Sequence, residues 1–129
     1  MRNYQRKKNN PYLLPHNLYM RVLYMIRDYD RLREEYHIVL ETSPPPPDGM
    51  PKGNILLDPT AEKAVRRADL SREIKSIEQA RFSVPIEYMD GVWDNIHYGA
   101  WFPPDAAECT YRRWKQRYIY HVAKNMNFI

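Results

Sequence analysis

Apolar residues recur at alternating spacings of four and three between residues 17 and 41. The repeat consists of Leu18, Val22, Met25, Tyr29, Leu32, Tyr36 and Val39. Such a seven-residue period predicts a helix that lies lengthwise on another helix, and Asn17 is a suitable N-cap. The other faces carry charges of mixed sign, which is typical of a solvated surface.

A second long helix is predicted over residues 58–82, with Asp58 as its N-cap and Pro59 at its first position. Its apolar stripe runs through Ala61, Ala64, Val65, Ala68, Ser71, Ile74 and Ile77. The small residues would allow a close approach to the first helix. Residues 42–57 contain four consecutive prolines, which favour an extended connection. We therefore predict an antiparallel hairpin of two long helices.

Two shorter helices follow in the pattern. Residues 84–98 form a helix opened by Pro85, in which Gly91 marks a close helix crossing, and Gly99 ends it. The last helix runs from Asp105 to about Met126, with Asp105 and Glu108 as a capping box. No strand pair is evident, although short extended segments are expected near residues 11–14 and 54–57. The predicted fold class is all-α, with the two C-terminal helices forming a degenerate helix-turn-helix.

These elements divide the chain into three parts. Residues 1–16 form a basic N-terminal arm, residues 17–82 the helical hairpin, and residues 83–129 a helix-turn-helix-like unit. Tyr12, Leu13 and Leu14 are the residues that would fix the arm on the body. The alternative for the arm is a frayed terminus.

The last helix divides into an apolar face and a basic one. Its apolar arc includes Tyr111, Trp114, Tyr118 and Ile119, and Lys115 falls within that arc, so its amine must reach out to solvent. A DNA-recognition helix needs this division, because one face docks on the domain while Arg and Gln reach bases and phosphates. The candidate nucleic-acid-binding residues are Arg112, Arg113, Gln116, Arg117, Tyr120 and Lys124, together with Arg6, Lys7 and Lys8 of the arm. The alternative is a solvated basic face.

Charge and composition support an anionic partner without identifying it. The net charge is +4, and the positive charges gather at the two ends of the chain. Eleven Tyr and three Trp against three Phe suit half-buried surfaces and interfaces. A single cysteine and the lack of a long apolar run predict a protein of a reducing cytoplasm with no membrane contact.

Catalytic and metal-binding patterns are not found in the sequence. His16, His37, His97 and His121 lie on different predicted elements without metal-ligand spacing. Cys109 has no paired base and is expected to be partly buried in the first turn of the last helix. There is no glycine-rich phosphate loop. We expect neither an enzyme nor a cofactor.

The stretches VPIEYMDGVWDNIHYG and TYRRWKQR resemble region four of bacterial sigma factors, in which a proline-started helix ending in Tyr-Gly precedes a second helix with a T-x-R-R run. The whole chain resembles small sigma-like regulators from prophages of Gram-positive bacteria, grouped near RinA and ArpU. That resemblance lies in YMRVLYMIRDYDRLREEY, in PPPPDGMPKGN followed by LDPTAEKA, and in YRRWKQRYIYHVAKN. The segment GAWFPPDAAEC is too short for a further helix. Either residues 84–98 are the first helix of the motif, or ordinary groove docking is lost.

The resemblance implies a phage-type DNA-binding transcription regulator whose partners are duplex DNA and host RNA polymerase. The alternative function is a non-DNA interaction module that modulates a host protein complex. It would act through the helical hairpin and the tyrosine-rich surface, with residues 17–41 contacting a partner or a second copy.

Overall fold

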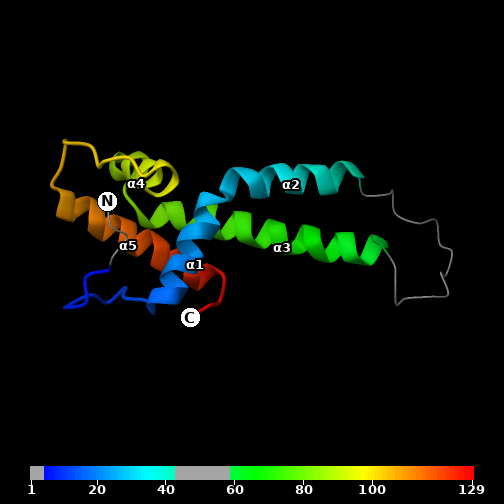
Figure 1. Cartoon of the computed structure of the whole chain (residues 1–129), viewed down its shortest axis with the longest axis horizontal. Coiled ribbons are helices and arrows are strands. Elements are labelled where there is room, and N and C mark those ends of the chain that lie inside the picture. The colour runs from blue at the N-terminus through cyan, green and yellow to red at the C-terminus, as the bar shows by residue number, and fades with distance from the viewer. Residues whose placement is uncertain (1–4, 43–58) are drawn as a thin grey trace.

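The computed structural model describes residues 5–42 and 59–129, and within these ranges the chain is helical with no strand (Figure 1). The predicted all-α class is confirmed. Residues 11–14 form a turn and irregular chain, whereas residues 54–57 and the proline-rich connection lie outside the described residues. The helices are α1 (His16–Arg27), α2 (Tyr29–Thr42), α3 (Pro59–Ala80), a 3-10 turn η1 (Arg81–Ser83), α4 (Ile86–Tyr98) and α5 (Glu108–Asn125).

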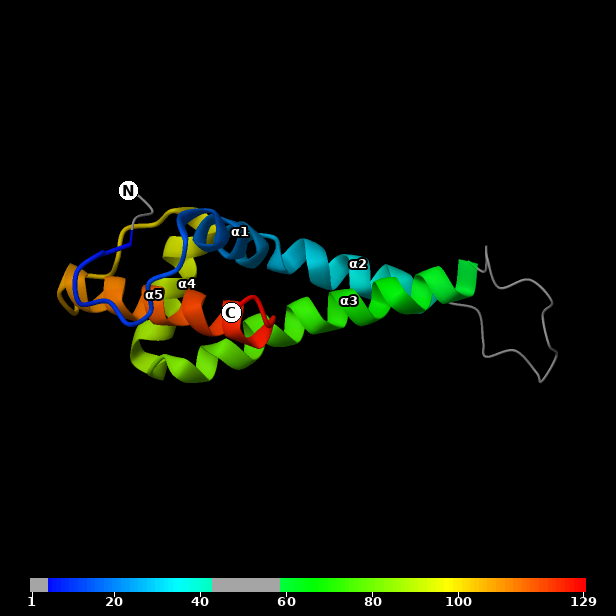
Figure 2. The same ribbon diagram turned by 90° about the horizontal axis from the view of Figure 1, so that it is seen from below.

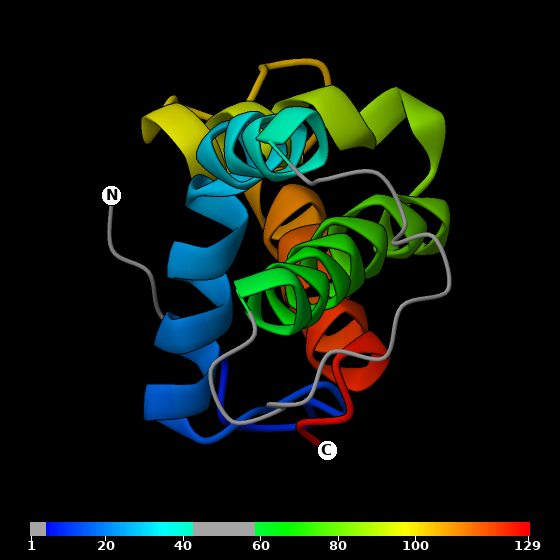
Figure 3. The ribbon, with the colours of Figure 1, turned by 90° about the vertical axis from the view of Figure 1, so that its right-hand side faces the viewer.

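The first predicted helix is two helices, so the prediction of one continuous element is wrong. The backbone N–H of Asp28 donates to both Tyr24 O and Met25 O at 3.1 Å, and the helix resumes where Leu32 N–H donates to Asp28 O at 2.8 Å. α1 and α2 point in clearly different directions (Figures 1 and 3). The change of direction lets α1 pack on α4 and α5 while α2 packs on α3.

α2 and α3 lie side by side and extend away from the other helices (Figures 1 and 2). At the near end Tyr29 OH donates to Glu78 Oε1 at 2.8 Å. At the far end Lys63 Nζ donates to Thr42 O at 3.0 Å. We call α2 after Leu32 together with residues 59–69 of α3 the extension.

The small-residue stripe of α3 does not make the predicted close approach. Ala61, Ala64 and Ala68 are exposed, and Val65 is 61% exposed. The buried apolar residues of this helix come later: Leu70, Ile74, Ile77 and Ala80. Among the described helices, α2 lies along the first half of α3, whereas the second half also packs against α5 (Figure 1).

The main core lies where α5 packs against α1, α4 and the second half of α3, and we call this part the head (Figure 3). Its fully buried side chains are Tyr19, Val22, Leu23, Ile26, Leu70, Ile77, Val92, Ile96, Tyr111, Tyr118, Ile119 and Val122. The C-terminal residues are tied to the same part. The Arg21 guanidinium lies 4.2 Å from the Phe128 ring centroid, and Arg72 Nη2 donates to Met126 O at 2.7 Å.

α4 follows its prediction closely. Pro85 occupies the N-cap position, and Gly99 ends the helix in the left-handed conformation with φ 65°. A Cβ on Gly91 would lie 2.7 Å from Tyr111 Cε1 and 2.8 Å from Pro103 Cδ. Gly91 is therefore in a tight contact with the Tyr111 ring of α5 and with Pro103 of the connecting segment, and no larger side chain fits there without movement. The predicted close crossing of two helices stays a prediction.

The start of α5 differs from the prediction. Ala107 occupies the N-cap position and no side chain caps the helix, so the capping box is wrong. Asp105 Oδ1 instead accepts a hydrogen bond from Tyr111 OH at 2.5 Å. Glu108 forms an ion pair with Arg112 at 2.8 Å one turn later. The two carboxylates that were expected to cap the helix thus interact with the side chains of Tyr111 and Arg112.

Candidate nucleic-acid interface

The N-terminal arm is folded back against the helices. The side-chain amide of Gln5 pairs with the backbone of Leu14: its Nε2 donates to Leu14 O and its Oε1 accepts from Leu14 N–H, both at 2.8 Å. These bonds close residues 5–14 into a loop. Leu14 is buried in the core, as predicted, whereas Leu13 is 43% exposed. The described part of the arm is therefore packed rather than frayed.

The arm covers the middle of α5. Gln116 Nε2 donates to Tyr12 O at 2.6 Å and to Gln5 Oε1 at 2.8 Å. Gln116 is only 8% exposed, so its predicted outward position is wrong. A helical wheel places it on the solvent side because the wheel contains no information about the arm. An amide held in this way cannot read an adenine edge unless the arm moves.

Arg117 and Tyr120 are also partly covered by Tyr12. The Tyr12 and Tyr120 rings meet edge to face at 5.2 Å. The Arg117 guanidinium lies 5.4 Å from the Tyr12 ring centroid and 5.5 Å from that of Trp114. Arg117 Nε is buried and has no hydrogen-bond acceptor among the described residues. Both side chains were predicted to face open solvent, and both instead contribute to a contact between the arm and α5.

Arg112, Arg113 and Lys124 are exposed, as the wheel predicts. Arg113 has no carboxylate partner within residues 5–42 and 59–129, whereas Arg112 pairs with Glu108. Lys124 lies twelve residues beyond Arg112, about 18 Å along the helix axis, and so belongs to the opposite end of α5. Arg6, Lys7 and Lys8 are exposed on the arm.

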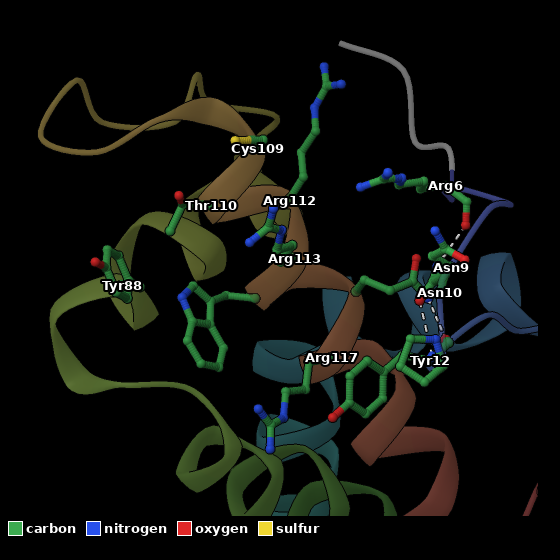
Figure 4. Close-up of a pocket in the computed structure, with 13 residues that line it drawn as sticks. Arg6, Asn9, Asn10, Tyr12, Tyr88, Cys109, Thr110, Arg112, Arg113 and Arg117 are labelled. Carbon is green, nitrogen blue, oxygen red and sulfur yellow. Dashed lines mark hydrogen bonds between the residues drawn. The ribbon is translucent and has the colours of Figure 1, made fainter.

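A groove of about 530 Å³ opens between the arm, the first turns of α5 and α4 (Figure 4). Arg6 faces Arg112 and Arg113 across its opening, and Arg117 lies beside Tyr12 farther along α5. The described lining residues include no Asp or Glu. They are Arg6, Asn9, Asn10, Pro11, Tyr12, Tyr88, Cys109, Thr110, Arg112, Arg113, Trp114, Gln116 and Arg117. Four arginine side chains, one from the arm and three from α5, thus line one concave surface.

Sequence reasoning missed the aromatic part of this groove. Tyr88 and Trp114 were assigned to apolar helix faces, yet both line the groove and are half-buried. Tyr12 was assigned only to holding the arm. Cys109 also lines the groove and is exposed, so the expectation of partial burial is wrong. The signal that could have revealed this site is the pairing of a basic, tyrosine-containing arm with a basic helix.

Lys115 is the one basic side chain of α5 that is directed into the head. It is 6% exposed, and its Nζ donates to Asn95 Oδ1 at 2.7 Å. Burial lowers the pKa of Lys115 to about 8, and the nearby charges of Arg27 and Arg112 act in the same direction. The expected escape of its amine to solvent does not occur, so Lys115 is unavailable to an external anion.

In the part of the chain that the structure describes, no three His, Cys, Asp or Glu side chains are grouped so as to share a metal ion. None of the helices described is long and apolar enough to cross a bilayer. No known protein family, curated protein or solved structure matches the chain. The resemblance to sigma region four therefore stays a prediction, and the basic groove carries the functional argument.

Proposed function

We propose that this protein binds DNA through the basic groove and the first turns of α5, as a small transcription regulator. The observation that carries the proposal is the convergence of Arg6, Arg112, Arg113 and Arg117 on a groove whose described lining has no carboxylate. These arginines come from opposite ends of the sequence. The regulatory role rests on the resemblance to sigma region four.

The exposed part of α5 fits one mode of duplex contact. In helix-turn-helix proteins the N-terminal residues of the recognition helix reach the base edges, while neighbouring segments hold the phosphates. Arg112 and Arg113 lie in the first two turns of α5 and are exposed. Lys7 and Lys8 of the arm are exposed beside the groove-lining Arg6, where they would contact phosphates.

The arm limits how far along α5 a duplex can make contact. Gln116, Arg117 and Tyr120 are engaged by Gln5 and Tyr12, so base readout is restricted to the start of the helix. A site of this kind favours backbone contacts over base contacts. We therefore expect binding that is strongly salt-dependent and only weakly sequence-selective.

The test is a titration of labelled duplex DNA by fluorescence anisotropy over a range of salt concentrations. About three to four phosphate contacts would give a slope of about −3 in a plot of log affinity against log salt. Replacing Arg112 and Arg113 together by Ala should weaken binding at least tenfold at low salt and make the slope shallower by about 2.

A matched control removes two positive charges elsewhere. Arg67 and Lys75 are exposed on α3 and do not line the groove. Their double replacement by Ala gives the same net charge as the test variant. Equal losses in the two variants would mean that net charge alone drives binding, and the groove would then have no specific role.

A second function, protein interaction, is favoured by Phe82 and Ile86. These side chains, on either side of Val84 and Pro85, are 91% and 92% exposed. The heptad face of residues 18–39 suits a partner less well, because Val22, Tyr29 and Leu32 are buried within the chain itself. Light scattering with and without DNA separates the two functions. A stable oligomer that ignores DNA at low salt would favour protein interaction.

A further inference from the structure

The size of the groove limits what it can enclose. Its volume of about 530 Å³ lies within the range of about 300–1,000 Å³ that is usual for pockets holding a small ligand. A base pair flanked by two phosphate backbones cannot enter a space of this size, whereas a single nucleotide can. A duplex would therefore rest on the rim and leave the interior of the groove empty.

The interior is lined by aromatic rings from three separate elements. Tyr12 comes from the arm, Tyr88 from α4 and Trp114 from α5. The Tyr88 and Trp114 rings are inclined by only 18° to each other, with centroids 6.1 Å apart. Unpaired bases bind proteins by stacking on such rings and on arginine planes, and they do so with little sequence preference.

Arg117 lies between the two sides of this aromatic lining. Its guanidinium contacts the rings of Tyr12 and Trp114, and its buried Nε lacks an acceptor within the described residues. Buried donors without partners are uncommon in folded proteins. Because this Nε has no exposed surface, an acceptor atom of a ligand could reach it only after a shift of Tyr12 or Trp114.

The cations are arranged to hold a phosphate at the mouth of the groove. Arg6 on the arm faces α5 across the opening, where Arg113 is exposed and has no carboxylate partner in the described residues (Figure 4). A phosphate at this position would be reached by cations from both sides. The aromatic rings would contact the base of a nucleotide, and the guanidinium groups at the opening would contact its phosphate.

We propose that the groove binds one nucleotide with an unpaired base, supplied by a single-stranded end or junction of DNA. The base lies against Trp114, Tyr88 or Tyr12, and its phosphate lies between Arg6 and Arg113. This inference rests on the proposed function for the arginine–phosphate contacts. It adds that the preferred DNA has unpaired nucleotides beside a duplex.

The experiment compares three forms of one labelled duplex against the full chain at an ionic strength of about 0.15 M. One form is blunt, one carries a short thymidine overhang, and one carries an overhang of abasic nucleotides with the same number of phosphates. Stacking should make the thymidine overhang bind at least tenfold more tightly than the abasic overhang. Equal affinity of these two forms would overturn the inference, since it would leave only charge.

Two variants locate the effect on the protein. Trp114→Leu should reduce the gain from the thymidine overhang, measured relative to the blunt duplex with the same variant, to less than about twofold. Trp101→Leu is the matched control, because Trp101 is 80% exposed and does not line the groove. A loss of the gain in Trp101→Leu and not in Trp114→Leu would place the unpaired base elsewhere.

A final competition experiment uses free thymidine monophosphate. Failure to compete at about millimolar concentration is expected, because a lone nucleotide lacks the contacts of the adjoining duplex. Tight binding of the free nucleotide without any gain from the overhang would overturn the assignment to a DNA strand. If the blunt duplex binds but the overhang adds nothing, the inference fails and the proposed function stands. If no form of DNA binds at low salt, the proposed function fails with it.

Discussion

The head and the extension share the helix α3 but bury it very differently. Residues 61–69 of α3 include no buried side chain, whereas Leu70, Ile74, Ile77 and Ala80 in the second half are buried. In the head α3 packs against α5, which α1 and α4 also contact, whereas in the extension the described part of α3 lies beside α2 (Figures 1 and 3). The first half of α3 carries mainly small and charged side chains, and its described neighbour is α2, so little apolar surface leaves water there. The second half carries large apolar side chains and packs against α5.

This difference assigns separate roles to the two regions. The head has the dense apolar packing that fixes α4, α5 and the arm, and hence the groove. The extension is joined by polar contacts such as Glu35 with Arg66, and it leaves Val65 and Ile38 more than half exposed. Regions with few buried apolar contacts open locally at low free-energy cost. We therefore expect the head to determine global stability.

The largest effect is expected when one apolar side chain is truncated in each region. Ile96→Ala in the head removes a fully buried side chain and should lower the free energy of unfolding by about 2–5 kcal/mol. Val65→Ala in the extension should change it by less than about 0.5 kcal/mol, since Val65 is mostly exposed. Urea unfolding followed by circular dichroism measures both. Similar losses in the two variants would contradict the assignment of stability to the head.

The second test uses pH, because the head buries a cation whereas the charges of the extension stay in water. The pKa of Lys115 is about 8 in the folded protein against an ordinary value of 10.5 for a solvated lysine, and burial is the main cause. Between pH 8 and 10 the unfolded chain therefore keeps this proton longer than the folded protein does, so Lys115 should contribute a rise of about 2 kcal/mol to the free energy of unfolding over this range.

The buried tyrosines oppose this rise as the pH approaches 10 and reverse it above. Burial raises the pKa of Tyr19 to about 12 and also raises that of Tyr118, so the unfolded chain loses these protons first. Stability then falls with rising pH. Lys115→Met should remove the rise between pH 8 and 10 and keep the fall above pH 10. A rise that persists in Lys115→Met would show that another group causes it.

How much of this fold the sequence predicts depends on how local each signal is. The positions of α3 and α4 follow from residues a few positions apart, such as Pro85 before α4 and Gly99 after it. The break at Asp28 was not predicted, because the apolar repeat runs through it without interruption. It arises since α1 and α2 pack against different partners, which is a tertiary property.

The third test concerns the tight contact at Gly91. An added Cβ would lie under 3 Å from both Tyr111 and Pro103, while Ala favours a helix over Gly by about 1 kcal/mol. Overpacking usually costs about 1–3 kcal/mol, so Gly91→Ala should be destabilising by about 1 kcal/mol net. Thermal unfolding measures the change. The same substitution in a Pro103→Ala background should cost less, and an equal cost in both backgrounds would locate the strain elsewhere.

The candidate site was less predictable than the fold, because its parts are far apart in sequence. The wheel correctly gave Arg112 and Arg113 as exposed but placed Gln116 outward. Gln116 donates a hydrogen bond to Gln5, which is 111 residues away, and no local sequence pattern can reveal such a contact. Lys115 was mispredicted for the same reason: it was expected to reach solvent, but Asn95 on α4 provides a hydrogen-bond acceptor for its buried amine.

The smallest effect is expected from the ion pair of the extension. Arg66 Nη2 lies 2.6 Å from Glu35 Oε1, and the two side chains are 47% and 32% exposed. Partly solvated pairs contribute about 0–1 kcal/mol, and salt screens them. Glu35→Gln should therefore leave the free energy of global unfolding nearly unchanged and accelerate hydrogen exchange of amides in the extension alone.

Asp28→Asn is the control, since it removes another exposed ion pair, that between Asp28 and Arg31 near the start of α2. If Glu35→Gln also accelerated exchange in α4 and α5, the extension and the head would open as one unit, and their separation in stability would be wrong.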